Sequence, residues 1–346
     1  MGAAVLLIPY LPRAYSYAML NRYIRNGLGG LLLAGILSTD AVAAEHTKPF
    51  DERYVKVDGI RLHCVTAGKG PLILFLHGFP EFWYEWKNQL REFGKDHLAV
   101  APDLPGYNLS DKPSELDQYR SSVLVEDIRK LADHFRHDKK FILVGHDWGG
   151  GLAWAFAIAH PDYLQKLIII NAPHPAIFGR MLASDPQQQE ASQYMFMFRS
   201  SRAEAILSAD NYASLVEHVL DPLLKTGALT EADKAAYLKA WSRPGALTGG
   251  LNYYRANHLG PPAPPQVEAE IGPSSNEFGP DPAHMIVKVP TLVIWGEKDT
   301  ALVPRNLDGL NEFVPQLTIR RVPQGSHWVI HERPAEVNDY IRAFIQ

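Results

Sequence analysis

Apolar runs of strand length alternate with helix-length amphipathic segments along most of the chain. Runs rich in apolar residues predict strands buried in a sheet, and they occupy residues 72–76, 97–101, 141–144, 167–170, 291–295 and 317–322. Helical patterns lie between or after them, up to about residue 93, over 120–136, over 151–157, near 304–313 and from 334. This alternation predicts an α/β protein with a mainly parallel, twisted sheet flanked by helices.

Two segments depart from this alternation. Residues 54–65 alternate around Asp58-Gly59, which predicts an antiparallel hairpin. Residues 188–240 carry helical patterns and no long β-branched run, and a Pro-rich segment at 259–282 predicts an ordered but irregular connector. We interpret this region as a helical cap inserted into the sheet domain. The predicted divisions are a core of residues 48–175 and 276–346 and a cap of residues 176–275.

The N-terminal segment, residues 1–43, has the order of a secretory signal. Arg22 and Arg25 precede an apolar stretch at 27–37, and Ala41-Val42-Ala43 has the small-residue spacing of a cleavage site. We predict export to the periplasm or the exterior. The apolar stretch is shorter than the roughly 20 residues that span a bilayer, so no membrane span is expected after processing. A cytoplasmic location and an uncleaved N-terminal membrane anchor are the alternatives.

Composition narrows the classes of partner. The chain has 346 residues, of which 46% are hydrophobic and 21% charged, enough for one large α/β domain with an insertion. A formal net charge of -4 and the lack of a long basic run argue against nucleic acid. Cys64 is the only cysteine, so no intramolecular disulfide is possible. We expect a small apolar substrate in a pocket, and the sequence leaves a homodimer open.

The strongest chemical signal follows the apolar run at 141–144. Gly145-His146-Asp147-Trp148-Gly149-Gly150 leads from this strand into a small-residue helix. A strand, a sharp turn with small neighbours and a helix make a nucleophile elbow, which exposes one side chain on a strained turn. That side chain is the carboxylate of Asp147. A carboxylate nucleophile attacks carbon and forms an ester intermediate.

Hydrolysis of such an ester needs a base and a carboxylate that orients it. Two loops follow late strands, where catalytic groups gather in a parallel sheet: one carries Asp299 and the other His327. The order nucleophile, acid, base matches that of α/β-hydrolases. Glu297 is the alternative acid. Asn171, after an earlier strand, is rejected because a neutral amide cannot stabilise an imidazolium as a carboxylate does.

The tetrahedral intermediate also needs two hydrogen-bond donors. In this fold they are the main-chain N–H of the residue after the nucleophile, here Trp148, and one from an earlier loop, here Phe79. We expect a cis peptide bond before Pro80, which would turn the Phe79 N–H inward. His77 is expected to be structural, with its ring bonded to loop backbone.

Several segments of the chain resemble the epoxide hydrolase group of the α/β-hydrolase superfamily. They are the elbow, the Asp299 and His327 loops, and His77-Gly78-Phe79-Pro80-Glu81-Phe82-Trp83-Tyr84-Glu85-Trp86. The resemblance covers nearly all of residues 50–346 and implies an α/β-hydrolase fold with a helical cap. Haloalkane and fluoroacetate dehalogenases share the same three residue types. Fluoroacetate dehalogenases carry arginines where this chain has Trp148 and Gly151, and many haloalkane dehalogenases have Asn in place of Phe79.

The resemblance also implies a cap tyrosine that donates a proton to the opening epoxide. Tyr254, in Leu251-Asn252-Tyr253-Tyr254-Arg255, stands at that position. Tyr194 is the candidate for a second donor, and an ungapped comparison places Phe196 there instead. The expected apolar tunnel is lined by Phe79, Trp148, Tyr194, Phe196 and Phe198. His174 is either structural or a substrate contact.

The predicted reaction is the hydrolysis of a lipophilic epoxide to a vicinal diol through an ester on Asp147. Water activated by His327 and Asp299 would release the diol. No metal or organic cofactor is expected. A dehalogenase that uses the same triad is the first alternative, and a non-catalytic receptor for a hydrophobic ligand is the second.

Overall fold

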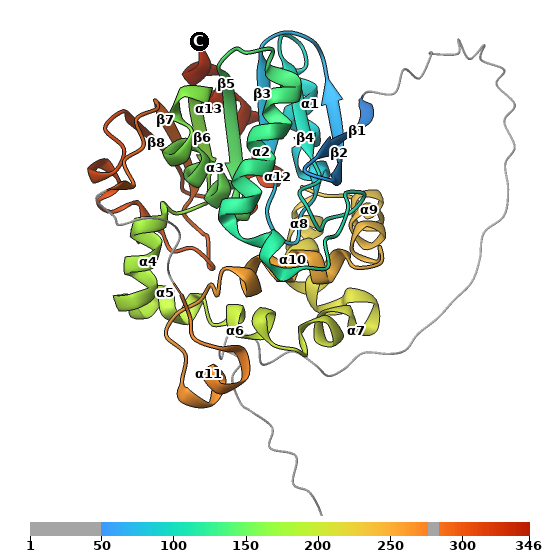
Figure 1. Ribbon diagram of the computed structural model, residues 1–346, viewed down its shortest axis with the longest axis vertical. Helices are drawn as coiled ribbons and strands as arrows, with labels where there is room; N and C mark the ends of the chain where they lie inside the picture. Colours follow the sequence, from blue (N-terminus) through green and yellow to red (C-terminus); the bar gives the residue numbers. More distant parts are fainter. Residues whose placement is uncertain (1–49, 276–283) are drawn as a thin grey trace, which may run out of the picture. The chain divides into compact units, whose positions relative to one another are not determined.

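One mixed sheet of eight strands organises the described part of the chain. The computed structural model describes residues 50–275 and 284–346, so the predicted signal segment lies outside the described residues. The strands are β1 (Asp51–Val57), β2 (Ile60–Ala67), β3 (Leu72–Leu76), β4 (Leu98–Pro102), β5 (Phe141–His146), β6 (Leu164–Ile170), β7 (Thr291–Gly296) and β8 (Leu317–Val322). Their spatial order is β1-β2-β4-β3-β5-β6-β7-β8 (Figure 1).

The sheet is mainly parallel, as predicted. The strands from β4 across to β8 pair in parallel, and only β2 runs against its neighbours. The predicted hairpin joins β1 to β2 at Asp58 and Gly59, whose φ values of 46° and 91° suit a tight left-handed turn. The α/β-hydrolase fold is therefore confirmed in its strand order and direction.

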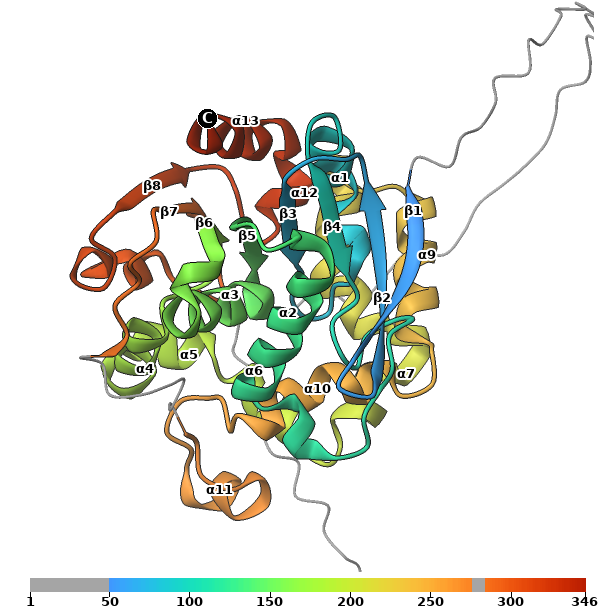
Figure 2. The ribbon, with the colours of Figure 1, turned by 45° about the horizontal axis from the view of Figure 1, so that its top comes forward.

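Side chains on the two faces of the sheet form separate cores. In β3, Ile73 and Phe75 pack with α1 (Lys87–Phe93) and α13 (Pro334–Ile345), whereas Leu74 and Leu76 pack with α2 (Ser121–Arg136) and α3 (Asp147–Ala159). Period-two alternation along the strand produces this division. Helices accordingly cover both faces (Figure 2), and this explains why the inner strands are apolar throughout.

The segment between β6 and β7 is helical. Its helices are α4 (Pro175–Ser184), α5 (Pro186–Ala191), α6 (Tyr194–Arg199), α7 (Ala203–Leu215, interrupted at Ala209–Tyr212), α8 (Asp221–Thr226), α9 (Glu231–Trp241), α10 (Ala246–Ala256) and α11 (Pro265–Ile271). A π-helical turn, η5 (Val216–Leu220), connects α7 to α8. We call α4 to α11 the cap. No helix of the described residues is long and apolar enough to cross a membrane.

Two predictions about elements need correction. The helix expected near residues 304–313 is wrong: the segment forms two short 3-10 turns, η7 (Pro304–Leu307) and η8 (Leu310–Glu312). Gly309, between them, has a φ of 78°, which breaks a right-handed helix. The Pro-rich connector is not wholly irregular, because α11 forms within it, beginning at Pro265, where a missing N–H costs no hydrogen bond.

Candidate active site

Asp147 stands on a strained turn where β5 ends and α3 begins. Its φ of 50° lies in the left-handed region, which is unfavourable for a residue with a side chain. The residues packed around this turn must be small. A Cβ on Gly78 would lie 2.2 Å from Asp147 Oδ1, and a Cβ on Gly149 would lie 2.1 Å from the Leu76 carbonyl oxygen. The elbow predicted from the sequence is thus present in the geometry.

The structure brings Asp147, His327 and Asp299 together from three loops. His327 Nδ1 lies 2.7 Å from Asp299 Oδ2, and His327 Nε2 lies 3.7 Å from Asp147 Oδ2. Burial lowers the pKa of His327, but the charge of Asp299, their hydrogen bond and the charge of Asp147 together raise it to about 9. The ring is placed to exchange a proton with a water molecule near Asp147.

A network of hydrogen bonds holds the acid in place. Asp299 Oδ1 accepts from main-chain N–H groups two and three residues further on, and Oδ2 accepts from Asn171 Nδ2 at 2.8 Å. Asn171 Oδ1 in turn accepts from the Gly296 N–H at 2.8 Å. Burial disfavours the charge on Asp299, but His327 holds the pKa of this carboxyl below its usual value. The alternative acid, Glu297, pairs with Arg321 at 2.9 Å instead.

Asn171 was missed as a supporting residue in the sequence, where it figured only as an unsuitable acid. Its φ of 40° is left-handed, which Asn tolerates better than most residues. An Asn directly after a buried strand, next to a loop that needs an anchored carboxylate, was the available signal.

The main-chain N–H predicted to be the first oxyanion donor contacts Asp147. The Phe79 N–H donates to Asp147 Oδ1 at 2.8 Å, and the Phe79–Pro80 bond is cis, as expected. Trp148 follows Asp147 in the first turn of α3, the position proposed for the second donor. His77 is fully buried and hydrogen-bonded through both ring nitrogens to main-chain groups, which fits the structural role predicted for it.

Aromatic side chains of the cap face the elbow. The buried ring of Tyr254, on α10, lies edge-on to Trp148, with centroids 5.2 Å apart, and to Phe79 at 5.8 Å. Tyr194, at the start of α6, lies 6.4 Å from Tyr254, and Phe198 lies 5.0 Å from it. Burial, and then the neighbouring Tyr194 and Asp147, raise the pKa of Tyr254 well above its usual value. Tyr254 is therefore a neutral phenol that can donate a proton.

A pocket of about 460 Å³ lies between the elbow and the cap. Core and cap both contribute to its lining, which consists of Asp147, Trp148, Gly151, Pro173, Pro175, Phe178, Tyr194, Met195, Tyr254, Leu259 and Leu302. Asp147 is the only ionised side chain among these lining residues. The wall is otherwise apolar or aromatic, as in sites for small organic ligands. Within the described residues, no group of three or more His, Cys, Asp or Glu side chains is arranged to hold a metal ion.

Of the five predicted substrate contacts, only Trp148 lines this pocket. His174 is fully buried: its Nδ1 accepts from the Ala176 N–H, its Nε2 bonds to the Met285 carbonyl, and its ring stacks on Phe313. Burial lowers the pKa of His174 to about 4. This ring caps α4, so the structural interpretation holds and the substrate contact does not. Phe79, Phe196 and Phe198 are also absent from the lining, whereas the predicted Tyr194 is part of it.

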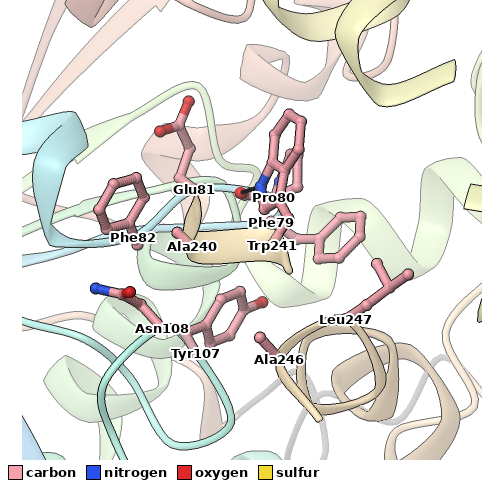
Figure 3. Close-up of a pocket in the computed structure, with 10 residues that line it drawn as sticks. All are labelled: Phe79, Pro80, Glu81, Phe82, Tyr107, Asn108, Ala240, Trp241, Ala246 and Leu247. Carbon is pink, nitrogen blue, oxygen red and sulfur yellow. Dashed lines mark hydrogen bonds between the residues drawn. The ribbon is translucent and has the colours of Figure 1, made fainter. Parts of the chain in front are cut away.

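A second, smaller hollow includes Phe79 in its lining but neither Asp147 nor His327. Its volume is about 270 Å³, and its lining is Phe79, Pro80, Glu81, Phe82, Tyr107, Asn108, Ala240, Trp241, Ala246 and Leu247 (Figure 3). The Trp241 indole donates to the Pro80 carbonyl at 2.6 Å. This bond fastens α9 of the cap to the loop that carries the oxyanion donor.

Comparison with known proteins agrees with this geometry. The family model described as alpha/beta hydrolase fold matches residues 71–334. The chain is 38% identical to the AB hydrolase superfamily protein YfhM of Bacillus subtilis, covering 85% of this chain and 97% of that protein. It is 36% identical to epoxide hydrolase 4 of Mus musculus, covering 84% of this chain and 78% of the mouse protein.

Solved structures give the same picture. The crystal structure of Bacillus megaterium epoxide hydrolase in complex with an inhibitor is 40% identical, with a TM-score of 0.77 over 85% of this chain and 99% of that chain. Potato (Solanum tuberosum) epoxide hydrolase I is 26% identical, with a TM-score of 0.69 over 86% of this chain and 99% of its own.

Proposed function

The chain belongs to the epoxide hydrolase group of the α/β-hydrolase fold family, and from this premise we propose that it hydrolyses lipophilic epoxides to vicinal diols. The observation that carries the proposal is that Asp147 of the core and Tyr254 of the cap line one apolar pocket. Opening an epoxide requires attack on a ring carbon and protonation of the ring oxygen together, so a nucleophile and a proton donor on different elements of one pocket suit this substrate.

In the first step a carboxylate oxygen of Asp147 bonds to an epoxide carbon, and the bond from that carbon to the ring oxygen breaks. The oxygen would leave as an alkoxide, so Tyr254 gives it a proton or a hydrogen bond. Tyr194, in the same pocket, is the second donor. The apolar walls exclude bulk water and favour a lipophilic substrate.

In the second step His327 removes a proton from water, which attacks the carboxyl carbon of the Asp147 ester. The N–H groups of Phe79 and Trp148 hold the oxyanion that forms. Asp299 stabilises the imidazolium. Because the ester carries no charge, the contribution of Asp147 to the pKa of His327 disappears, and the ring becomes available as a base.

The first test is diol formation from a small panel of aliphatic and aryl epoxides. Tyr254→Phe should lower kcat/KM by on the order of a hundredfold, because it removes the proton donor. Tyr253→Phe is the matched control. The Tyr253 hydroxyl donates to the Pro105 carbonyl at 2.9 Å, outside the lining of the pocket, so this variant should keep its turnover.

The alternatives give different results in the same assays. Halide release from a chlorinated or brominated alkane that survives Tyr254→Phe, without diol from any epoxide, would favour a dehalogenase. A receptor would form no covalent bond. If the protein is instead a hydrolase, the ester should accumulate on Asp147 in His327→Gln after epoxide is added, and intact-mass measurement would detect it.

A further inference from the structure

Glu85 is a buried carboxyl group that the proposed reaction does not use. It lies in the 3-10 turn η2 (Trp83–Trp86) and is fully buried. Its Oε1 lies against Nδ1 of His146, and neither oxygen has a hydrogen-bond partner elsewhere in the described part of the chain. An isolated buried carboxylate is costly, so this group needs an explanation.

His146, the partner of Glu85, connects the proposed nucleophile, Asp147, with the main chain of the proposed base, His327. His146 directly precedes Asp147, and its Nε2 lies 2.8 Å from the main-chain carbonyl of His327. A carbonyl only accepts, so Nε2 carries a proton. In a neutral ring Nδ1 is then an acceptor that faces another acceptor at Glu85. The contact is attractive only if a proton lies between the two.

The surroundings decide where that proton resides. Burial lowers the pKa of His146 to about 4. Burial, followed by the charge on Glu81, raises the pKa of Glu85 well above its usual value. Glu81 is itself matched by His331 at 3.2 Å and accepts a hydrogen bond from the Tyr237 hydroxyl. Because the charge of His331 already balances the carboxylate of Glu81, the charge of a second carboxylate at Glu85 would be uncompensated.

The other charged groups facing Glu85 are His331 and His327, which favour its ionisation, and Asp147, which disfavours it. We propose that Glu85 is a positioning residue: as a neutral carboxylic acid it donates a hydrogen bond to His146 Nδ1, and His146 in turn holds the main chain of His327. This arrangement also keeps a negative charge away from His327. A carboxylate at Glu85 would keep the ring protonated when the ester must be hydrolysed, a consequence that rests on the proposed function.

Infrared spectroscopy tests the protonation of Glu85 without any substrate. At pH 8 the wild type should show the C=O band of a protonated carboxyl group, and Glu85→Gln should lack it. Asp127→Asn is the control: Asp127 is another buried carboxyl group whose pKa is raised to about 7, so at pH 8 it is mostly ionised and should contribute little to this band. A spectrum that Glu85→Gln leaves unchanged in this region would overturn the proposal.

Kinetics test the positioning role. Glu85→Gln keeps a donor for His146 Nδ1 and should retain kcat within about twofold, with an unchanged pH profile. Glu85→Leu removes the donor and should slow ester hydrolysis about tenfold, so that the alkylated enzyme accumulates in intact-mass measurements. A pH profile displaced by one unit in Glu85→Gln, or wild-type hydrolysis in Glu85→Leu, would contradict the proposal.

The two tests also separate this inference from the proposed function. If no epoxide is turned over by the wild type, while the infrared band is present and disappears in Glu85→Gln, the reaction is wrong. That result still supports a neutral Glu85 paired with His146.

Discussion

Asp147 and His327 influence each other's charge through a separation of 3.7 Å. In the resting protein a carboxylate lies beside a ring whose pKa is raised to about 9, so at neutral pH the ring is protonated. The ring cannot then act as a base. Loss of the Asp147 charge on ester formation would release it, and the first half of the reaction would thereby prepare the second.

This coupling gives a prediction for Asp147→Ala. Removing a negative charge disfavours the imidazolium, so the pKa of His327 should fall below about 9. An NMR titration of the His327 ring would measure the change. Glu297→Gln is the control, since Glu297 pairs with Arg321 and should leave this titration alone. An unchanged pKa in Asp147→Ala would show that the charge of Asp147 does not contribute to the value.

The grouping of Asp147, Asp299 and His327 could be predicted because each lies in the turn or loop that follows a strand, and apolar runs identify these strands. The bonding of His174 could not, because its Nε2 partner is a carbonyl 111 residues away. The choice between Tyr194 and Phe196 depends on the rotation of α6, a helix of 6 residues, too short to show a period. Local sequence does not fix such long-range or rotational details.

At the scale of elements, continuous apolar character predicted β3, β5, β6 and β7 well, because both faces of these strands are covered. The failure at η7 and η8 has a tertiary cause. The side chain of Asn306 is buried and bonds to Gln188 Oε1 at 2.7 Å. This contact with the cap, together with Gly309, prevails over the local helical pattern.

A prediction at this scale concerns α2. Burial and then the charge on Asp58 raise the pKa of Asp127 from 3.8 to about 7. A carboxyl group whose pKa is higher in the folded state than in the unfolded state makes its full contribution to stability at a pH below the unfolded-state pKa. This contribution is lost as the pH rises through the folded-state pKa. Asp127→Asn should therefore unfold like the wild type below pH 3.8 and be more stable above pH 7. We expect a gain on the order of 1 kcal/mol.

Thermal or urea unfolding across this pH range would measure the difference. A conservative surface change on the same helix, such as Asp133→Asn, should lack the pH-dependent gain, because Asp133 forms exposed ion pairs with Arg129 and Arg136. If Asp127→Asn gained no stability at any pH, the buried carboxyl would not be a source of strain.

At the scale of the whole molecule, the site is assembled from distant parts of the chain: Phe79, Asp147, Tyr254, Asp299 and His327. Sequence alone indicates the order of these residues but not the close approach of cap to core. That approach depends on aromatic contacts such as Tyr254 with Trp148. The hydrolase core was therefore easier to predict than the shape of the pocket.

The predicted secretory signal concerns the location of the whole molecule. If residues 1–43 direct export, N-terminal sequencing of the mature protein should begin at Ala44. Ala43→Arg, which places a large charged residue at the cleavage position, should leave the segment attached. A mature chain that starts at Met1 or Met19 in a cytosolic fraction would refute export.

The hydrogen bond from the Phe79 N–H to Asp147 Oδ1 also decides the fate of individual oxygen atoms. With Oδ1 held by that amide, Oδ2 is the oxygen left to join the substrate in the proposed reaction. Water attack on the carboxyl carbon then breaks the bond from that carbon to Oδ2, and the new hydroxyl leaves with an atom that belonged to the protein. Each diol would thus carry oxygen from the aspartate, and the water consumed in one cycle would supply the atom delivered in a later one.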